Sequence, residues 1–67
     1  MFVELNLSTG KRIFINVNQI NNFFESRDNV VVVCQNGEED VFRVTESYEQ
    51  VKEIITKKIE ENASRRN

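Results

Sequence analysis

Carboxylates are the side chains of this sequence that could do chemistry, and they gather in two short acidic runs. One run is Glu38-Glu39-Asp40 and the other is Glu60-Glu61. Adjacent carboxylates can bind a metal ion or serve as a general acid and base. The first run, however, follows a predicted hairpin turn and lacks the Asp-x-Asp-x-Asp-Gly spacing of a calcium loop. We therefore expect solvated carboxylates and no metal site.

Most other catalytic chemistry is excluded by residue types that the chain lacks. Its 67 residues include no histidine and one cysteine, Cys34, which excludes a His-based triad, a Cys/His zinc site and an internal disulfide. The two glycines, Gly10 and Gly37, both fall at predicted turns, so there is no Gly-rich phosphate loop. We expect a non-enzymatic protein with no catalytic residues and no cofactor.

Composition and charge favour a small folded domain. Hydrophobic residues make up 39% of the chain and charged residues 30%, as in soluble globular domains. The net charge of −2 argues against nucleic acid as a partner, because nucleic-acid-binding domains are usually basic. The longest apolar run, Val30–Cys34, is far shorter than the ~20 residues that cross a bilayer, and the N-terminus does not resemble a signal peptide. We therefore expect a cytoplasmic protein without a transmembrane segment.

Alternating apolar residues predict five short strands joined by tight reversals. Ser8–Lys11 forms the first turn, the Asn-rich segment before Ile20 forms a turn or single helical turn, and Arg27-Asp28-Asn29 forms the next reversal. Asn36-Gly37 is the strongest hairpin signal, since a type I′ turn needs two positive φ angles. The result is an antiparallel meander, either an open sheet or a small curled barrel. Its expected strands are 2–7, 12–17, 22–25, 30–35 and 40–44.

The period of the apolar residues then changes to that of a helix. Ser47 can cap the helix, and Gln50 completes a Ser-x-x-Gln capping box. One apolar stripe follows, and charged residues occupy the rest of the cylinder. We expect one α+β domain over residues 1–62 and a frayed polar tail over 63–67. The stripe consists of Tyr48, Val51, Ile54, Ile55 and Ile59.

The sheet carries more apolar residues than one helix can cover. The valine run places apolar side chains on both faces of its strand, which is typical of a strand buried on both sides. Either the sheet curls into a barrel within one chain, or two chains pack together. We expect self-association, which would make the protein a homo-oligomer. The candidate self-association face consists of Phe14, Phe24, Val31, Val33 and Phe42.

The spacing of turn, cap and core residues resembles that of the small flagellar FlbD/SwrD proteins. The resemblance covers about residues 2–59, and it departs from the family pattern at Arg27, where a proline is usual, and at Asn29, where a threonine is usual. The matching stretches are Leu5 to Lys11, Phe14-Ile15-Asn16, Ile20, Arg27-Asp28-Asn29, Val30 to Val33, Asn36-Gly37, Val44-Thr45-Glu46-Ser47 and Val51.

The resemblance implies a small cytoplasmic accessory of bacterial flagella. In that family the role is linked to swarming and to the power output of the motor, through contacts with flagellar or stator proteins. It implies no catalytic residues and no cofactor. The family-pattern positions, whose physical roles look structural, are Asn16, Asp28, Asn36, Gly37, Glu46 and Ser47.

Two other interpretations stay open at this point. Five short strands followed by a helix is also the architecture of the CsrA-type RNA-binding regulators. The chain lacks their basic opening, however, and the segment before the helix has one basic residue, Arg43. A phage or mobile-element protein that binds one host protein fits the size equally well.

Overall fold

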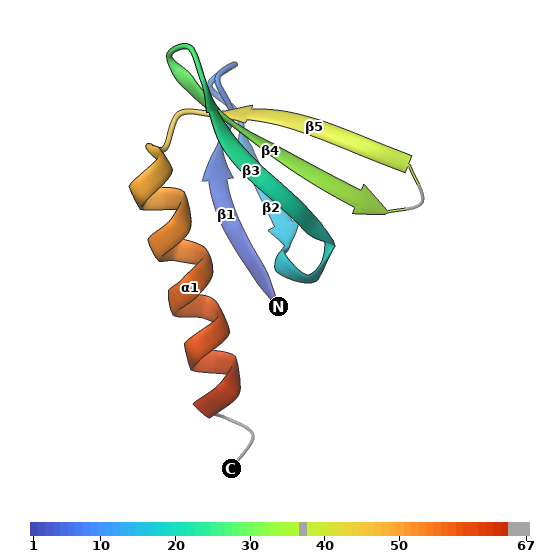
Figure 1. Ribbon diagram of the computed structural model, residues 1–67, viewed down its shortest axis with the longest axis vertical. Coiled ribbons are helices and arrows are strands. Elements are labelled where there is room, and N and C mark those ends of the chain that lie inside the picture. The colour runs from blue at the N-terminus through green and yellow to red at the C-terminus, as the bar shows by residue number, and fades with distance from the viewer. Residues whose placement is uncertain (37, 65–67) are drawn as a thin grey trace.

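The fold consists of five antiparallel strands in two sheets, followed by one helix. The computed structural model describes residues 1–36 and 38–64. The strands and helices lie close to the predicted positions, which confirms the α+β meander (Figure 1). The elements are β1 (Phe2–Asn6), β2 (Arg12–Asn16), the 3-10 helix η1 (Val17–Gln19), β3 (Ile20–Ser26), β4 (Asn29–Asn36), β5 (Glu38–Val44) and α1 (Tyr48–Ser64).

The first sheet is the β1–β2 hairpin. Its turn is closed by Gly10, whose φ of 93° lies in the region that glycine adopts without strain. The register pairs Val3 with Ile15 and Leu5 with Ile13, so these four apolar side chains share one face. This face turns inward, since Val3, Leu5 and Ile15 are all buried.

The second sheet has the order β3-β4-β5, with the valine-rich β4 in the centre. Phe23 and Phe42 lie opposite Val32 on the two neighbouring strands and share its face. The register places Asn36 opposite Glu38, whereas a two-residue Asn36-Gly37 turn would pair Gln35 with Glu38. The pairing of β4 with β5 is therefore shifted by one residue from the register that the predicted two-residue turn would set. Gly37 itself lies outside the described residues.

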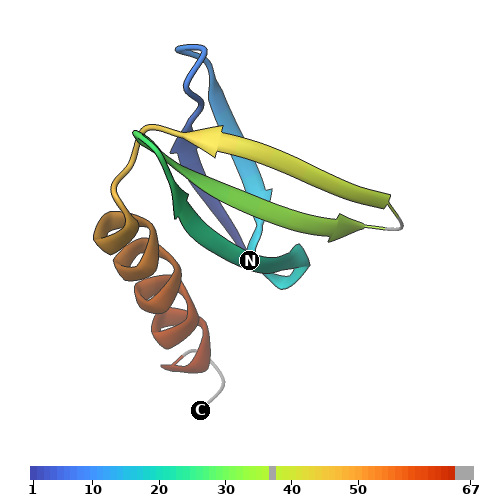
Figure 2. The same cartoon turned by 45° about the horizontal axis from the view of Figure 1, so that its top comes forward.

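The core lies between the inner faces of the two sheets and one side of the helix. Leu5 from β1, Val32 and Val44 from the second sheet, and Val51 from α1 are fully buried there. The helix runs alongside β1, while the far end of the β4–β5 hairpin projects away from it (Figures 1 and 2). The helix therefore contributes Val51 to a core built mainly by strands.

The two sheets meet at a short seam between the ends of β1 and β5. Leu7 and Val44 form an isolated antiparallel bridge, flanked by hydrogen bonds from Ser8 N–H to the Arg43 carbonyl (2.9 Å) and from Thr45 N–H to the Asn6 carbonyl (2.8 Å). The Glu46 carboxylate then accepts the Asn6 main-chain N–H at 3.0 and 3.1 Å and the Asn6 Nδ2 at 2.7 Å. One side chain thus ties β1 to the segment that enters the helix.

The sheets do not close into a barrel in the part of the chain that the structure describes. Strand β2 pairs with β1 alone, and β3 pairs with β4 alone, so no ladder joins β2 to β3. The predicted meander is thus open rather than barrel-like over the described residues, and its strands are divided between two sheets, which the prediction of a single open sheet did not include. None of the described helices is long and apolar enough to span a membrane.

The predicted capping box is confirmed. Ser47 Oγ accepts the Gln50 N–H at 3.2 Å, and Gln50 Oε1 accepts the Ser47 N–H at 2.8 Å. The helix continues to Ser64, two residues beyond the expected boundary at Asn62. The remaining residues of the predicted tail, 65–67, lie outside the described part of the chain.

We expect the Glu46→Ala substitution to lower the free energy of unfolding by about 1–2 kcal/mol, because it removes a charged acceptor of three hydrogen bonds at the seam. Urea denaturation of the wild type, Glu46→Ala and Glu53→Ala measures this loss. Glu53 is an exposed acid of α1 and serves as the control. Equal losses for the two variants would contradict the structural role of the seam.

The β3–β4 turn yields a second stability prediction. Arg27 has a φ of 55°, a left-handed conformation that costs a non-glycine L-residue roughly 1–2 kcal/mol. Arg27→Gly removes this cost, so we expect thermal unfolding to show a gain of about 0.5–1 kcal/mol. Arg27→Pro should destabilise the chain, because the proline ring holds φ near −65°. A glycine variant that is less stable than the wild type would refute this account of the turn.

Candidate functional site

An open groove lies where the β1–β2 hairpin faces the three-stranded sheet away from the seam. Its volume is about 360 Å³, within the range of ligand and peptide clefts. The two sheets meet at the seam and diverge from there (Figure 2). The lining residues are Phe2, Ile13, Phe14, Ile15, Asn16, Gln19, Cys34, Asp40 and Phe42.

One wall of the groove is the outer edge of β2. Val17 N–H donates to the Met1 carbonyl at 2.8 Å, and Leu7 N–H donates to the Lys11 carbonyl at 2.7 Å. Hydrogen-bonded pairs alternate along an antiparallel ladder, so the odd-numbered residues of β2 bond to β1. The N–H and C=O of Phe14 consequently point away from β1, toward the groove side. Four consecutive residues of this strand, 13–16, line the groove.

An aromatic pair stands at the mouth of the groove. The rings of Phe2 and Phe14 are stacked with centroids 5.1 Å apart and planes inclined by 19°. Phe14 is nevertheless 66% exposed and Phe2 45% exposed. Burying large aromatic rings drives most protein association, and such rings are enriched at interfaces. This pair is therefore a candidate contact for another molecule.

Asp40 supplies the charge of the groove. Among the described residues that line the groove it is the one charged residue, and the other polar side chains there are the amides of Asn16 and Gln19. Asp40 lies opposite Cys34 in the β4–β5 ladder. Burial, together with the negative charge of Asp40, raises the pKa of the Cys34 thiol. The thiol is thus held protonated and is poorly suited to act as a nucleophile.

The structure distributes the five predicted self-association residues over three places. Phe14 lies on the hairpin, at the groove. Phe42 lies opposite Val32 and faces the core, where it also lines the groove. Phe24, Val31 and Val33 share the outer face of the three-stranded sheet.

The outer face of the three-stranded sheet is less exposed than its composition suggests. Val31 is 4% exposed and Val33 is 7% exposed, although both lie outside the main core cluster. Their cross-strand neighbours on that face include Phe24 and Val41, which are 47% and 56% exposed. The apolar surface left on this face therefore belongs to Phe24 and Val41, and Val41 was not among the predicted residues.

The family-pattern residues occupy structural positions. The Asn16 side chain accepts the Asn18 N–H at 3.1 Å and caps η1. Asp28 belongs to the β3–β4 turn, and Asn36 ends β4. Glu46 forms the seam, and Ser47 caps α1. None of the described members of this set faces another as part of a common site.

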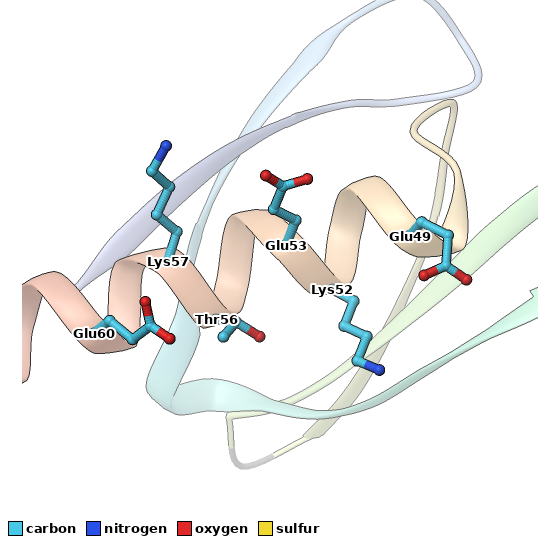
Figure 3. A pocket seen from close by; sticks show the side chains of 6 residues that line it. All are labelled: Glu49, Lys52, Glu53, Thr56, Lys57 and Glu60. Carbon is cyan, nitrogen blue, oxygen red and sulfur yellow. The ribbon is translucent and has the colours of Figure 1, made fainter.

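The solvent side of α1 also carries a hollow, of about 540 Å³. Figure 3 shows that all six side chains around it project from this one helix, and no second element forms an opposite wall. Spaces between long side chains on a convex helix surface do not make a binding site. The six residues are Glu49, Lys52, Glu53, Thr56, Lys57 and Glu60. Among the described residues, no three acidic or cysteine side chains are grouped to hold a metal ion.

No family model, curated protein or solved structure matches the chain.

Self-association through the outer sheet face stays a prediction, and Phe24 is the residue to test it. We expect Phe24→Glu to reduce the sedimentation-equilibrium mass to the 7.9 kDa of one chain while the circular dichroism is unchanged. Arg43→Glu, on the same face, is the control for added negative charge. A wild-type chain that is already monomeric, or a Phe24→Glu oligomer of unchanged mass, would refute this interface.

Proposed function

We propose that the protein is a non-enzymatic module that acts by binding another protein through the groove beside β2. The observation that carries the proposal is the exposed Phe2–Phe14 stack at the mouth of a groove that borders the free edge of β2. Exposed aromatic groups around a cleft are typical of protein interfaces, where such residues often dominate the binding energy. The protonated, buried Cys34 and the scattered carboxylates offer no comparable support for catalysis.

For the cellular role we propose a flagellar accessory that contacts a motor or stator protein. This setting rests on the resemblance to the FlbD/SwrD proteins over about residues 2–59. The described family-pattern residues lie in caps, turns and the seam, and Asn16 also lines the groove; the other groove residues are not among the family-pattern positions. None of the described residues that line the groove is basic, so RNA binding gains no support from it.

Site-specific photo-crosslinking in the source organism tests this proposal. A benzoylphenylalanine residue replaces Phe14 in one strain and Thr56, on the solvent side of α1, in the control strain. We expect position 14 to yield an adduct that contains a flagellar motor or stator protein, and position 56 to yield none. An adduct with an unrelated protein would refute the flagellar role alone, whereas the absence of an adduct specific to position 14 would refute the groove as the binding site.

The same groove should be needed for motility. We expect a deletion strain to form smaller swimming rings, and the wild-type gene or Glu53→Gln to restore them fully. Phe14→Ser should restore them poorly while folding normally, because Phe14 is 66% exposed and contributes little to the core. Full restoration by Phe14→Ser at equal protein level would contradict the proposed role of the groove.

A further inference from the structure

We infer that the groove binds an extended segment of a partner protein, which adds as a strand to the free edge of β2 and places a basic side chain against Asp40. The inference rests on the proposed function and specifies the partner's chemistry. Addition of a strand to an exposed sheet edge is an established mode of peptide recognition, in which the main chain gives affinity and alternate side chains give specificity.

The edge of β2 differs from the other described strand edges. Strand β3 carries a register shift between Ile20 and Asn22, and such bulges disfavour strand addition. Strand β1 is engaged by the seam at Asn6 and by the neighbouring helix. The register of β2 with β1 is regular from Arg12 to Asn16, and no described strand pairs with its other side. Strand β5 also has a regular register and is bridged at Val44 to Leu7, which follows β1, but four consecutive residues of β2 line the groove, so β2 is the edge that we assign.

The ladder determines which positions of an added strand would face the groove. Phe14 presents its N–H and C=O at the free edge, so one partner residue would pair with it. The side chain of that residue would lie on the outer face, beside the exposed ring of Phe14. The two residues flanking it would point to the opposite face, toward Ile13 and Ile15 and into the groove.

The negative charge of Asp40 determines which type of side chain suits one of the two flanking positions of the partner strand. Asp40 is the one charged lining residue, and no basic side chain forms an ion pair with it among the described residues. A partner strand would remove water from this carboxylate, which is costly unless a cation pairs with it. We assign a lysine or arginine to one flanking position and an apolar residue, set against the ring of Phe42, to the other.

A second copy of this chain that pairs symmetrically about Phe14 does not satisfy the same requirement. If two β2 strands paired about Phe14, the flanking residues of the partner copy would be Ile13 and Ile15. Both are apolar, so Asp40 would be covered without a counter-charge. Arg12 of the second copy would not reach it, because Arg12 lies on the same face as Phe14. A copy shifted so that Arg12 lies opposite Phe14 would bring Lys11 to a flanking position, and this is the register in which a second copy competes with a different chain.

Selection from a random 12-residue peptide library displayed on phage tests the inference. The full-length wild-type chain, Asp40→Asn and the control Glu53→Gln are used as targets. We expect peptides selected on the wild type and on Glu53→Gln to be enriched in lysine or arginine next to a large apolar residue. The enrichment should be lost on Asp40→Asn, and a wild-type-selected peptide should bind that variant about three- to tenfold more weakly.

Backbone pairing is tested with the same synthetic peptide. N-methylation of alternate amides should abolish binding at one set of positions and be tolerated at the other, as expected for a strand paired on one side. Chemical-shift changes in the labelled protein should centre on residues 12–16 and 40–42.

Each contrary outcome has a distinct meaning. Peptides without basic enrichment that still shift residues 12–16 would overturn the inferred basic partner and leave the proposed function standing. Peptides that bind elsewhere, or no selected peptides at all, would overturn both. A wild-type dimer whose interface shifts map to β2 would show that a second copy occupies the edge, and would also refute the inference.

Discussion

The seam between β1 and β5 is the constraint on which the rest of the structure depends. The chain forms two small sheets, and the two-stranded β1–β2 hairpin is marginally stable alone. The Leu7–Val44 bridge and the three hydrogen bonds from Asn6 to Glu46 hold the sheets face to face at one end. Because the seam is short, the sheets diverge beyond it, and the same contact that completes the core also leaves a groove.

The groove explains why apolar side chains remain exposed in so small a protein. A 67-residue chain buries only about 60% of its unfolded surface, so its core is small and excess aromatic residues cannot all enter it. Phe2 and Phe14 shield part of each other by stacking, yet both stay accessible beside an unpaired strand edge. Edge strands are usually protected against pairing with another chain. A protein-binding role would explain why this edge is exposed.

Local features of the fold could be predicted from the sequence, and long-range features could not. The capping box at Ser47 and the strand β4 depend on residues that are neighbours in the sequence, so the local sequence pattern was sufficient to predict both. The division into two sheets depends on pairing between Leu7 and Val44, residues far apart in the chain, and no local pattern marks it. The seam residue Glu46 was singled out by the resemblance, but its bond to Asn6 was not foreseen.

The candidate site was predicted in part, and a register difference explains one of the errors. A two-residue turn at Asn36-Gly37 would set Phe42 opposite Val31, on the outer face. The observed register is shifted by one residue, which moves every β5 side chain to the other face and places Phe42 toward the groove. Phe2 was not among the predicted site residues. The predicted hairpin pairs the strand of Phe2 with the strand of Phe14, and this could have indicated that the two rings lie close together.

Amide hydrogen exchange along β2, followed by NMR in a dilute sample of the full chain, shows whether the edge of this strand is free. We expect the amides of Ile13 and Ile15, which bond to β1, to be protected, and the amide of Phe14 to exchange freely at the open edge. Equal protection of Phe14 and Ile15 would contradict this expectation, because the edge of β2 would then already be paired.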